Sequence, residues 1–582
     1  MGDPRLRIRG RWPAMFVAVA LGVAPSFAAP SQQAPTAKPA ADAEEHLFGI
    51  YLAGKHAEQV RDYPAAAAWF DKAATIDPGA PELISRDFLM AVGAGDFDRA
   101  KTVAPQELQI DSSDVLAEMV LIIDRLKAGD GAGAVEHAQA LSQDGIHRFI
   151  VPAAQAWAKM AAGDLPGADA ALQQYDQYNG FEPLKNFQLG LLYDYAGNAA
   201  KAEEYYNKAL DATTQLNWRL TDAIANFYER HGKEAAAKAL YKEFTGQNAG
   251  SEIARSVLAA RPAGVPKPQI GSAADGLAES LFDLASVLNQ TETLDLALVY
   301  VRFSLALQPN FRLAQLLLSD ILSAQDKPEL SLAVLDEIPR NSPYSWSARL
   351  RVAANLEALD RTDEAIAQLR QMAAESPTSI SAYVQLGDVL RNKKQFKEAA
   401  AAYDEAITRA AAQGLPDRWT LLYDRGVSYE RSGDWTKAEA DLEHALELKP
   451  DQAIVLNYLG YSWIDKGEKL DQGLKMIEKA VELRPKDGYI VDSLGWAHYR
   501  MGDYAGAVKY LERAVELVPD DSTINDHLGD AYWRTGRQTE ARYQWRRALQ
   551  FGPEQEDIPP IEGKLAHGLA PPPTAAPAER GG

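Results

Sequence analysis

Three consecutive stretches of the chain decide the fold: NYLGYSWIDKGEKLDQGLKMIEKAVELRP (457–485), DSLGWAHYRMGDYAGAVKYLERAVELVP (492–519) and DHLGDAYWRTGRQTEARYQWRRALQFGP (526–553). Each has a glycine three residues after its start, alanines further on and a closing proline. Together with Pro450, the closing prolines are 35, 34 and 34 residues apart. A fixed step of about 34 residues is the period of a repeat made of two antiparallel helices. This part of the chain is therefore predicted to be a stack of helical pairs.

The same spacing runs through most of the chain and indicates an array of tetratricopeptide (TPR) units. Gly54 is followed at offsets of 12, 16, 19 and 24 by Ala66, Phe70, Ala73 and Pro78. Small side chains let the two helices of a unit approach closely, the large one fills the gap between units, and the proline ends the second helix. We predict an all-α fold, a superhelical α-solenoid of roughly fourteen TPR units in two halves.

The repeat pattern also divides the chain. The segment between the two halves carries glycines and three prolines and is predicted to be a linker or insertion, with a disordered hinge and an ordered packed loop both left open. The predicted segments are a signal peptide (1–28), a disordered linker (29–43), a partly degenerate N-terminal TPR array (44–244), the linker or insertion (245–272), a C-terminal TPR array (273–553), a capping helix (554–569) and a disordered tail (570–582).

The two ends of the chain carry separate signals. Four arginines between Arg5 and Arg11 precede a short apolar run, 14–23, and small residues ahead of Ala29 suit a signal peptidase. A cleaved signal predicts export to the periplasm, and an uncleaved membrane anchor is the alternative. At the other end, Ile561, Leu565 and Leu569 are predicted to cover the exposed face of the last repeat.

Composition narrows the classes of function. The chain has 582 residues, a formal net charge of −21 and no cysteine. An acidic body repels phosphate backbones and anionic lipid, so no nucleic-acid partner is expected. Without cysteine, neither a disulfide nor a lipid anchor at a mature N-terminus is expected, so any membrane association after signal cleavage would come through partners.

No motif for catalysis stands out in the sequence. The Gly-Lys dipeptides are not followed by Ser or Thr, as a phosphate-binding loop requires, and there is no G-x-S-x-G or H-E-x-x-H. The nine histidines show no metal-ligand spacing. We therefore expect no enzymatic activity, no catalytic residue, no cofactor and no metal site.

The first helices of TPR units line the concave face of the array, which suits protein binding. Aromatic rings flanked by polar groups are typical of a recognition surface, although packing between adjacent first helices is the alternative. No lysine stands where the chaperone cochaperones hold a terminal carboxylate, so no such clamp is predicted. The candidate groove residues are Asn457, Tyr461, Ile464 and Asp465; Asp492, Trp496, Tyr499 and Arg500; and Asp526, Asp530, Trp533 and Arg534.

The segment LGYSW…IEKAVELRP, with the two copies that follow it, resembles the C-terminal part of a proteobacterial family of exported TPR proteins. The resemblance covers roughly residues 415–550. Characterised relatives are outer-membrane lipoprotein adaptors that bind a periplasmic carboxyl-terminal processing protease and deliver cell-wall hydrolases to it. This chain departs from them in having no lipidation cysteine.

The resemblance implies a periplasmic adaptor that binds a protease and its clients through a superhelical groove. The extra residue near 467–471, which makes one repeat step 35 residues long, marks the region where docking is expected first. A structural or assembly factor of a cell-envelope complex, for secretion or polysaccharide export, is the alternative.

Overall fold

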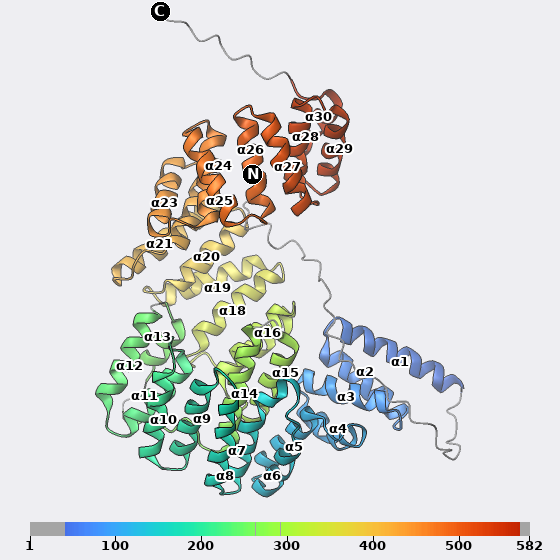
Figure 1. Cartoon of the computed structure of the whole chain (residues 1–582), viewed down its shortest axis with the longest axis vertical. Coiled ribbons are helices and arrows are strands. Elements are labelled where there is room, and N and C mark those ends of the chain that lie inside the picture. Colours follow the sequence, from blue (N-terminus) through green and yellow to red (C-terminus); the bar gives the residue numbers. More distant parts are fainter. Residues whose placement is uncertain (1–40, 249, 262–263, 291–292, 571–582) are drawn as a thin grey trace, which may run out of the picture. The chain divides into compact units, whose positions relative to one another are not determined.

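The computed structural model describes residues 41–248, 250–261, 264–290 and 293–570 (Figure 1). Within these ranges the chain forms thirty α-helices and two short 3₁₀ helices, with no strand. The predicted signal peptide, most of the predicted N-terminal linker and all but one residue of the predicted tail lie outside the described residues. The chain divides between Gln368 and Leu369 into two compact units, here called the N-terminal unit and the C-terminal unit.

The N-terminal unit contains the helices up to α18 and the start of α19. Its helices are α1 (Ala41–Gln59), α2 (Tyr63–Ile76), α3 (Pro81–Ala94), α4 (Phe97–Ile110), α5 (Val115–Lys127), α6 (Gly131–Ala140), η1 (Gly145–Phe149), α7 (Val151–Ala161), α8 (Leu165–Gln173), η2 (Gln174–Gln177), α9 (Glu182–Tyr195), α10 (Ala199–Asp211), α11 (Trp218–Arg230), α12 (Glu234–Gln247), α13 (Glu252–Ala259), α14 (Ala273–Gln290), α15 (Leu294–Leu307), α16 (Arg312–Ala324), α17 (Pro328–Asp336) and α18 (Ser345–Ala358).

The C-terminal unit begins within α19 (Thr362–Glu375). Its other helices are α20 (Ser381–Asn392), α21 (Phe396–Ala412), α22 (Trp419–Arg431), α23 (Trp435–Leu448), α24 (Ala453–Lys466), α25 (Leu470–Leu483), α26 (Gly488–Arg500), α27 (Tyr504–Leu517), α28 (Ser522–Arg534), α29 (Gln538–Gln550) and α30 (Ile558–His567). Within the two units, the described α-helices form thirteen helix pairs, with α13, α18, α19 and α30 outside them, which confirms the predicted all-α solenoid.

The close approach of the paired helices explains the small residue in each first helix. A Cβ atom added to Gly529 of α28 would lie 2.5 Å from the Trp545 ring of α29, and one added to Gly387 would lie 2.6 Å from the Tyr403 ring. Both rings are fully buried. The glycine and the large residue thus form one packing unit, as their spacing predicts.

The turn between the two helices of a pair combines a left-handed backbone position with a helix cap. Gly502 adopts a φ of 85°, which favours glycine, and Asp503 then caps α27 by accepting a 2.9 Å hydrogen bond from the Gly506 amide. The turn that holds the extra residue has two left-handed positions, Gly467 and Lys469, with φ of 74° and 43°. The longer repeat step is therefore absorbed in the turn.

The segment 245–272, which was predicted to separate the two halves of the array, lies inside the N-terminal unit. It contains α13, and the Asn226 side chain donates a 3.0 Å hydrogen bond to the Lys267 carbonyl. Arg261 pairs with Asp222 at 2.9 Å, and Ile270 is buried. These contacts hold its described residues against α11, so they form a packed loop inside the N-terminal unit. The division into compact units lies about a hundred residues further on, within a continuous helix.

The last helix, α30, lies within the range predicted to cap the array. Ile561 is buried, and Leu565 and Leu569 pack with it against a cluster that includes Leu528, Trp545 and Ala548. The apolar face of the last helix pair is thereby covered.

Candidate functional site

The concave face of the N-terminal unit is filled by helices of the same unit. The first helices of four successive pairs, α3, α5, α7 and α9, contact α14 or α15 (Figure 1). Trp157 of α7 lies at the centre, fully buried, and a Cβ atom added to Gly276 of α14 would lie 2.4 Å from its ring. The position where a TPR array would admit a partner is therefore occupied by the chain itself.

Buried polar contacts fix α14 in this position. The Trp157 indole lies 3.3 Å from Gln188 Oε1 and donates a 3.2 Å hydrogen bond to the Ser280 hydroxyl. The Gln188 amide donates to Asp283 at 3.1 Å, and Arg219 pairs with the buried Glu279. Because each polar group finds a partner across the contact, α14 is held in one register.

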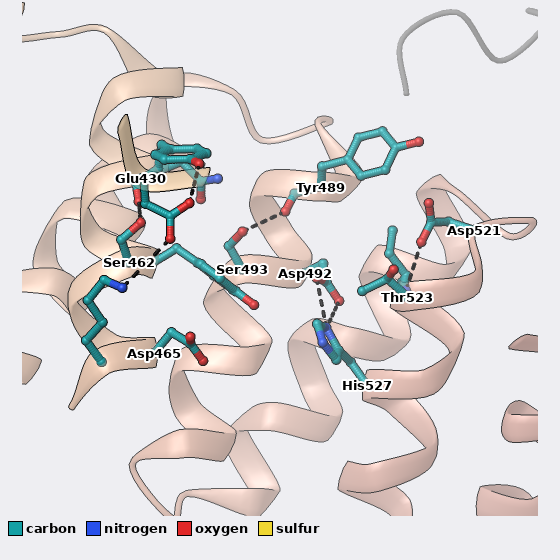
Figure 2. Close-up of a pocket in the computed structure, with 14 residues that line it drawn as sticks. Glu430, Ser462, Asp465, Tyr489, Asp492, Ser493, Asp521, Thr523 and His527 are labelled. Atoms are coloured by element: carbon teal, nitrogen blue, oxygen red, sulfur yellow. Dashed lines mark hydrogen bonds and ion pairs between the residues drawn. The ribbon is translucent and has the colours of Figure 1, made fainter. Parts of the chain in front are cut away.

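In the C-terminal unit, the first helices α22, α24, α26 and α28 instead border an open pocket with a volume of about 110 Å³ (Figure 2). We call it the groove pocket. Its lining is rich in carboxylates, hydroxyls and tyrosine rings. The lining residues are Glu430, Asn457, Tyr458, Tyr461, Ser462, Asp465, Lys466, Tyr489, Asp492, Ser493, Asp521, Thr523, Ile524 and His527.

Four of the predicted groove residues line this pocket: Asn457, Tyr461, Asp465 and Asp492. Asn457 is 5% exposed, and its Oδ1 atom is buried with no hydrogen-bond partner among the described residues. Asp492 is 7% exposed. Ile464 is buried in the core beneath, among the apolar residues of α24 to α26. The repeat register thus identifies the residues on α24 and α26 that reach the pocket.

The predicted residues further along α26 serve packing between neighbouring first helices. The Trp496 ring lies stacked between Tyr499, 4.7 Å away, and His527, 4.0 Å away. Arg500 extends back to α24, where its Nη1 atom lies 2.6 Å from Asp465. Trp496, Tyr499 and Arg500 therefore contact other residues of α24, α26 and α28, as the alternative interpretation, packing between adjacent first helices, predicts.

The groove positions of the last helix pair are bound by the chain's own C-terminal segment. Lys564 of α30 lies between Asp526 and Asp530, with its Nζ atom 2.7 and 2.9 Å from their carboxylates. Trp533 donates a 3.2 Å hydrogen bond to the Leu569 carbonyl, and Arg534 donates one of 2.5 Å to the Ala570 carbonyl. These predicted residues therefore do bind polypeptide, but from within the same chain.

Carboxylates of the last helix pair also shift the pKa of His527, which lines the groove pocket. Burial of the His527 ring opposes its charged form, but the Asp492 carboxylate 3.0 Å away, with Asp526 and Asp530 nearby, outweighs burial and raises the pKa. For Asp530, burial is the largest cause that raises the carboxyl pKa, and Asp526 adds to it. Burial also raises the pKa of the Tyr461 hydroxyl, so Tyr461 stays neutral at physiological pH.

The groove prediction missed several lining residues, among them Glu430, Tyr458, Tyr489 and His527. Figure 2 shows Asp492 and His527 pointing toward each other from neighbouring helices. Tyr458, Ser493 and His527 each directly follow a predicted groove residue, so this second repeating column was visible in the sequence.

In the described part of the chain, no group of three or more His, Asp or Glu residues is placed to hold a metal ion. None of its helices combines the length and the apolar character that a membrane span needs.

Comparison with known proteins agrees with the repeat architecture. Tetratricopeptide repeat profiles match residues 186–215, 378–451, 423–488 and 493–556. The TPR repeat-containing protein PA4667 of Pseudomonas aeruginosa is 34% identical over 128 residues, which are 22% of this chain. This match covers 21% of the length of that relative.

Solved structures with a similar helical arrangement include the APC/C hetero-tetramer Cut9–Hcn1, at 14% identity and a TM-score of 0.39, with 90% of this chain and 96% of that chain covered. A tetratricopeptide repeat protein from Parabacteroides merdae has 14% identity and a TM-score of 0.33, with 50% and 97% covered. The profile matches and the helix pairs together show that the chain contains tetratricopeptide repeats, which imply a scaffold for protein–protein interaction.

Proposed function

We propose that the chain is a periplasmic scaffold that binds partner polypeptides in the groove of its C-terminal unit and presents client proteins to an envelope protease. The observation that carries the binding role is the groove pocket, bordered by four successive first helices and including Asn457, whose buried Oδ1 atom has no hydrogen-bond partner among the described residues. The N-terminal groove is filled by α14 and α15, so the C-terminal groove is the surface on which a partner is expected.

Support for the periplasmic adaptor role comes from the sequence. The arginine-rich start and apolar run favour export, and residues 415–550 resemble exported TPR adaptors. TPR scaffolds are typically non-catalytic, so the adaptor supplies placement and the protease supplies the chemistry.

Photo-crosslinking in the intact cell tests this proposal. A benzophenone amino acid at Tyr461, which lines the groove pocket, is compared with one at Tyr543 of α29, which is 56% exposed. We expect the Tyr461 probe, and not the Tyr543 probe, to capture a periplasmic carboxyl-terminal processing protease or one of its substrates, identified by mass spectrometry. Capture of cytoplasmic proteins alone would overturn the proposal.

A second measurement addresses presentation to the protease. The purified chain, added to the captured protease and its client, should accelerate client degradation, and a Tyr461→Ala variant should do so less. A single stable complex of fixed stoichiometry, with no effect on proteolysis, would favour an assembly factor instead.

A further inference from the structure

The groove pocket has an excess of hydrogen-bond acceptors and of negative charge. Glu430, Asp465 and Asp492 come from three successive first helices and Asp521 lies at the start of a fourth, whereas Lys466 and His527 are the basic side chains of the lining. The Lys466 Nζ atom lies 3.8 Å from Glu430. Both oxygens of Asp492 lie 3.0 Å from the His527 Nδ1 atom, so this carboxylate already has one partner within the chain. Asp465 is bound on one oxygen by Arg500, which leaves acceptor capacity on the carboxylate, since an ionised carboxylate has about four acceptor sites. A ligand that supplies donors and positive charge fits this lining.

Asn457 adds a second, independent indication. Its Oδ1 atom is buried and lacks a donor among the described residues, and leaving such an acceptor unmet is costly. The lining also includes three tyrosine rings, Tyr458, Tyr461 and Tyr489, and the face of such a ring stabilises an ammonium or guanidinium group placed over it.

The chain itself shows what the groove holds where it is occupied. Asp526 of the last pair stands 34 residues after Asp492, at the same register of the repeat. Asp526 binds the ammonium group of Lys564 at 2.7 Å, while Trp533 and Arg534 hold carbonyls of the same segment. At this register an aspartate therefore binds a basic side chain in both pairs, Lys564 at Asp526 and His527 at Asp492.

From these contacts we infer that the groove pocket takes a lysine or arginine side chain of the partner segment, held by Asp465, Asp492 and Asn457. This inference rests on the proposed function and adds the chemistry of the recognised segment. It excludes a partner anchored by an acidic side chain or a terminal carboxylate, because either would be repelled by the carboxylates of the lining.

Calorimetric titration of the full chain with acetylated tetralysine amide and with tetraglutamate tests the inference. We expect tetralysine to bind at one site, and the Asp465→Asn/Asp492→Asn variant to weaken that binding at least tenfold. The matched control is Glu478→Gln/Glu516→Gln, which removes the same charge from exposed positions on the second helices α25 and α27. The control variant should bind as the wild type does.

A further variant, Asn457→Leu, removes the unmet acceptor without changing charge and should also weaken tetralysine binding, with folding verified by thermal denaturation. Equal weakening in the control variant, equal binding of tetraglutamate, or an intramolecular crosslink from Tyr461 to residues 571–582 would overturn the inference. If the Tyr461 probe still captures a periplasmic partner while tetralysine fails to bind, only the basic chemistry is wrong and the scaffold role stands.

Discussion

In the N-terminal unit the first helices α3, α5, α7 and α9 face α14 and α15 of the same unit, whereas in the C-terminal unit α22, α24, α26 and α28 face an open pocket. The two concave faces also differ in chemistry. Trp157 and Gly276 meet in a fully buried contact, while Asp465 and Asp492 border a pocket. The same repeat therefore serves as an internal packing surface in one unit and as a candidate recognition surface in the other.

The largest effect is expected from a substitution in the filled concave face of the N-terminal unit. Trp157→Ala removes the ring that packs on Gly276 and the hydrogen bonds to Gln188 and Ser280. We expect the N-terminal unit to lose about 3–5 kcal/mol of unfolding free energy, the usual cost of truncating a buried tryptophan. Urea denaturation followed by circular dichroism measures the loss. Trp69→Ala, at a partly buried tryptophan, should cost much less, and equal losses would show that the filling of the groove adds no stability.

A smaller effect is expected where the chain's own segment occupies the C-terminal groove. Lys564→Met leaves Asp526 and Asp530 facing each other without the ammonium group. We expect the free energy of unfolding to fall by about 2 kcal/mol. This is less than the loss for a fully buried ion pair, because Lys564 retains some solvent contact. Lys475→Met, at an exposed lysine of α25, is the control and should leave the melting temperature unchanged. A loss as small as that of the control would mean that α30 is held by its apolar face alone.

The two helices of the last pair, α28 and α29, pack closely against each other. In Gly529→Ala the new methyl group would lie 2.5 Å from the Trp545 ring, so we expect a loss of about 1–2 kcal/mol. Gly563→Ala in α30 meets nothing within 4 Å and should be neutral or slightly stabilising. Thermal denaturation of the two variants gives the comparison. Equal melting temperatures would contradict the tight contact between α28 and α29.

The sequence predicted the features that recur in every helix pair, but not the contacts between helices that are far apart in the chain. Glycine at 387 and 529 opposite large residues followed from spacing alone, as did the pocket positions Asn457 and Asp492. The filling of the N-terminal groove did not, because Trp157 and Ser280 are 123 residues apart and meet only through the packing of whole helices. The division within α19 carries no sequence signal, since the helix is continuous there.

Capping shows the same limit on a smaller scale. The apolar residues Ile561 and Leu565 predicted that α30 covers the last pair, because their helical spacing is visible. The polar part of that contact, from Trp533 and Arg534 to carbonyls of residues 569 and 570, depends on where the chain runs after the helix ends. Backbone acceptors have no signature in a sequence, so these groove residues could not be distinguished from open ones.

The smallest expected effect is on the pH dependence of stability, and it involves one histidine from each unit. His147 lies beside Tyr300 of α15, 2.6 Å from its hydroxyl, and burial lowers the pKa of the ring although Asp114 opposes this. His527 lies 3.0 Å from Asp492 of α26, the charges of Asp526 and Asp530 act on it as well, and its pKa is raised. The filled face thus favours a neutral ring, and the open face favours a charged one.

The two units should therefore respond to pH in opposite ways. His527 contributes to the free energy of unfolding in full below its unfolded pKa of about 6.5, and this contribution is lost as the pH rises through the raised folded pKa. The contribution of His147 to the same free energy is present above about pH 6.5 and is lost as the pH falls toward the lowered folded pKa. Unfolding free energies measured between pH 5.5 and 8.5 should show His527→Asn removing a loss of stability toward high pH and His147→Asn removing a loss toward low pH. The same pH dependence in both variants would mean that the acidic lining does not control His527.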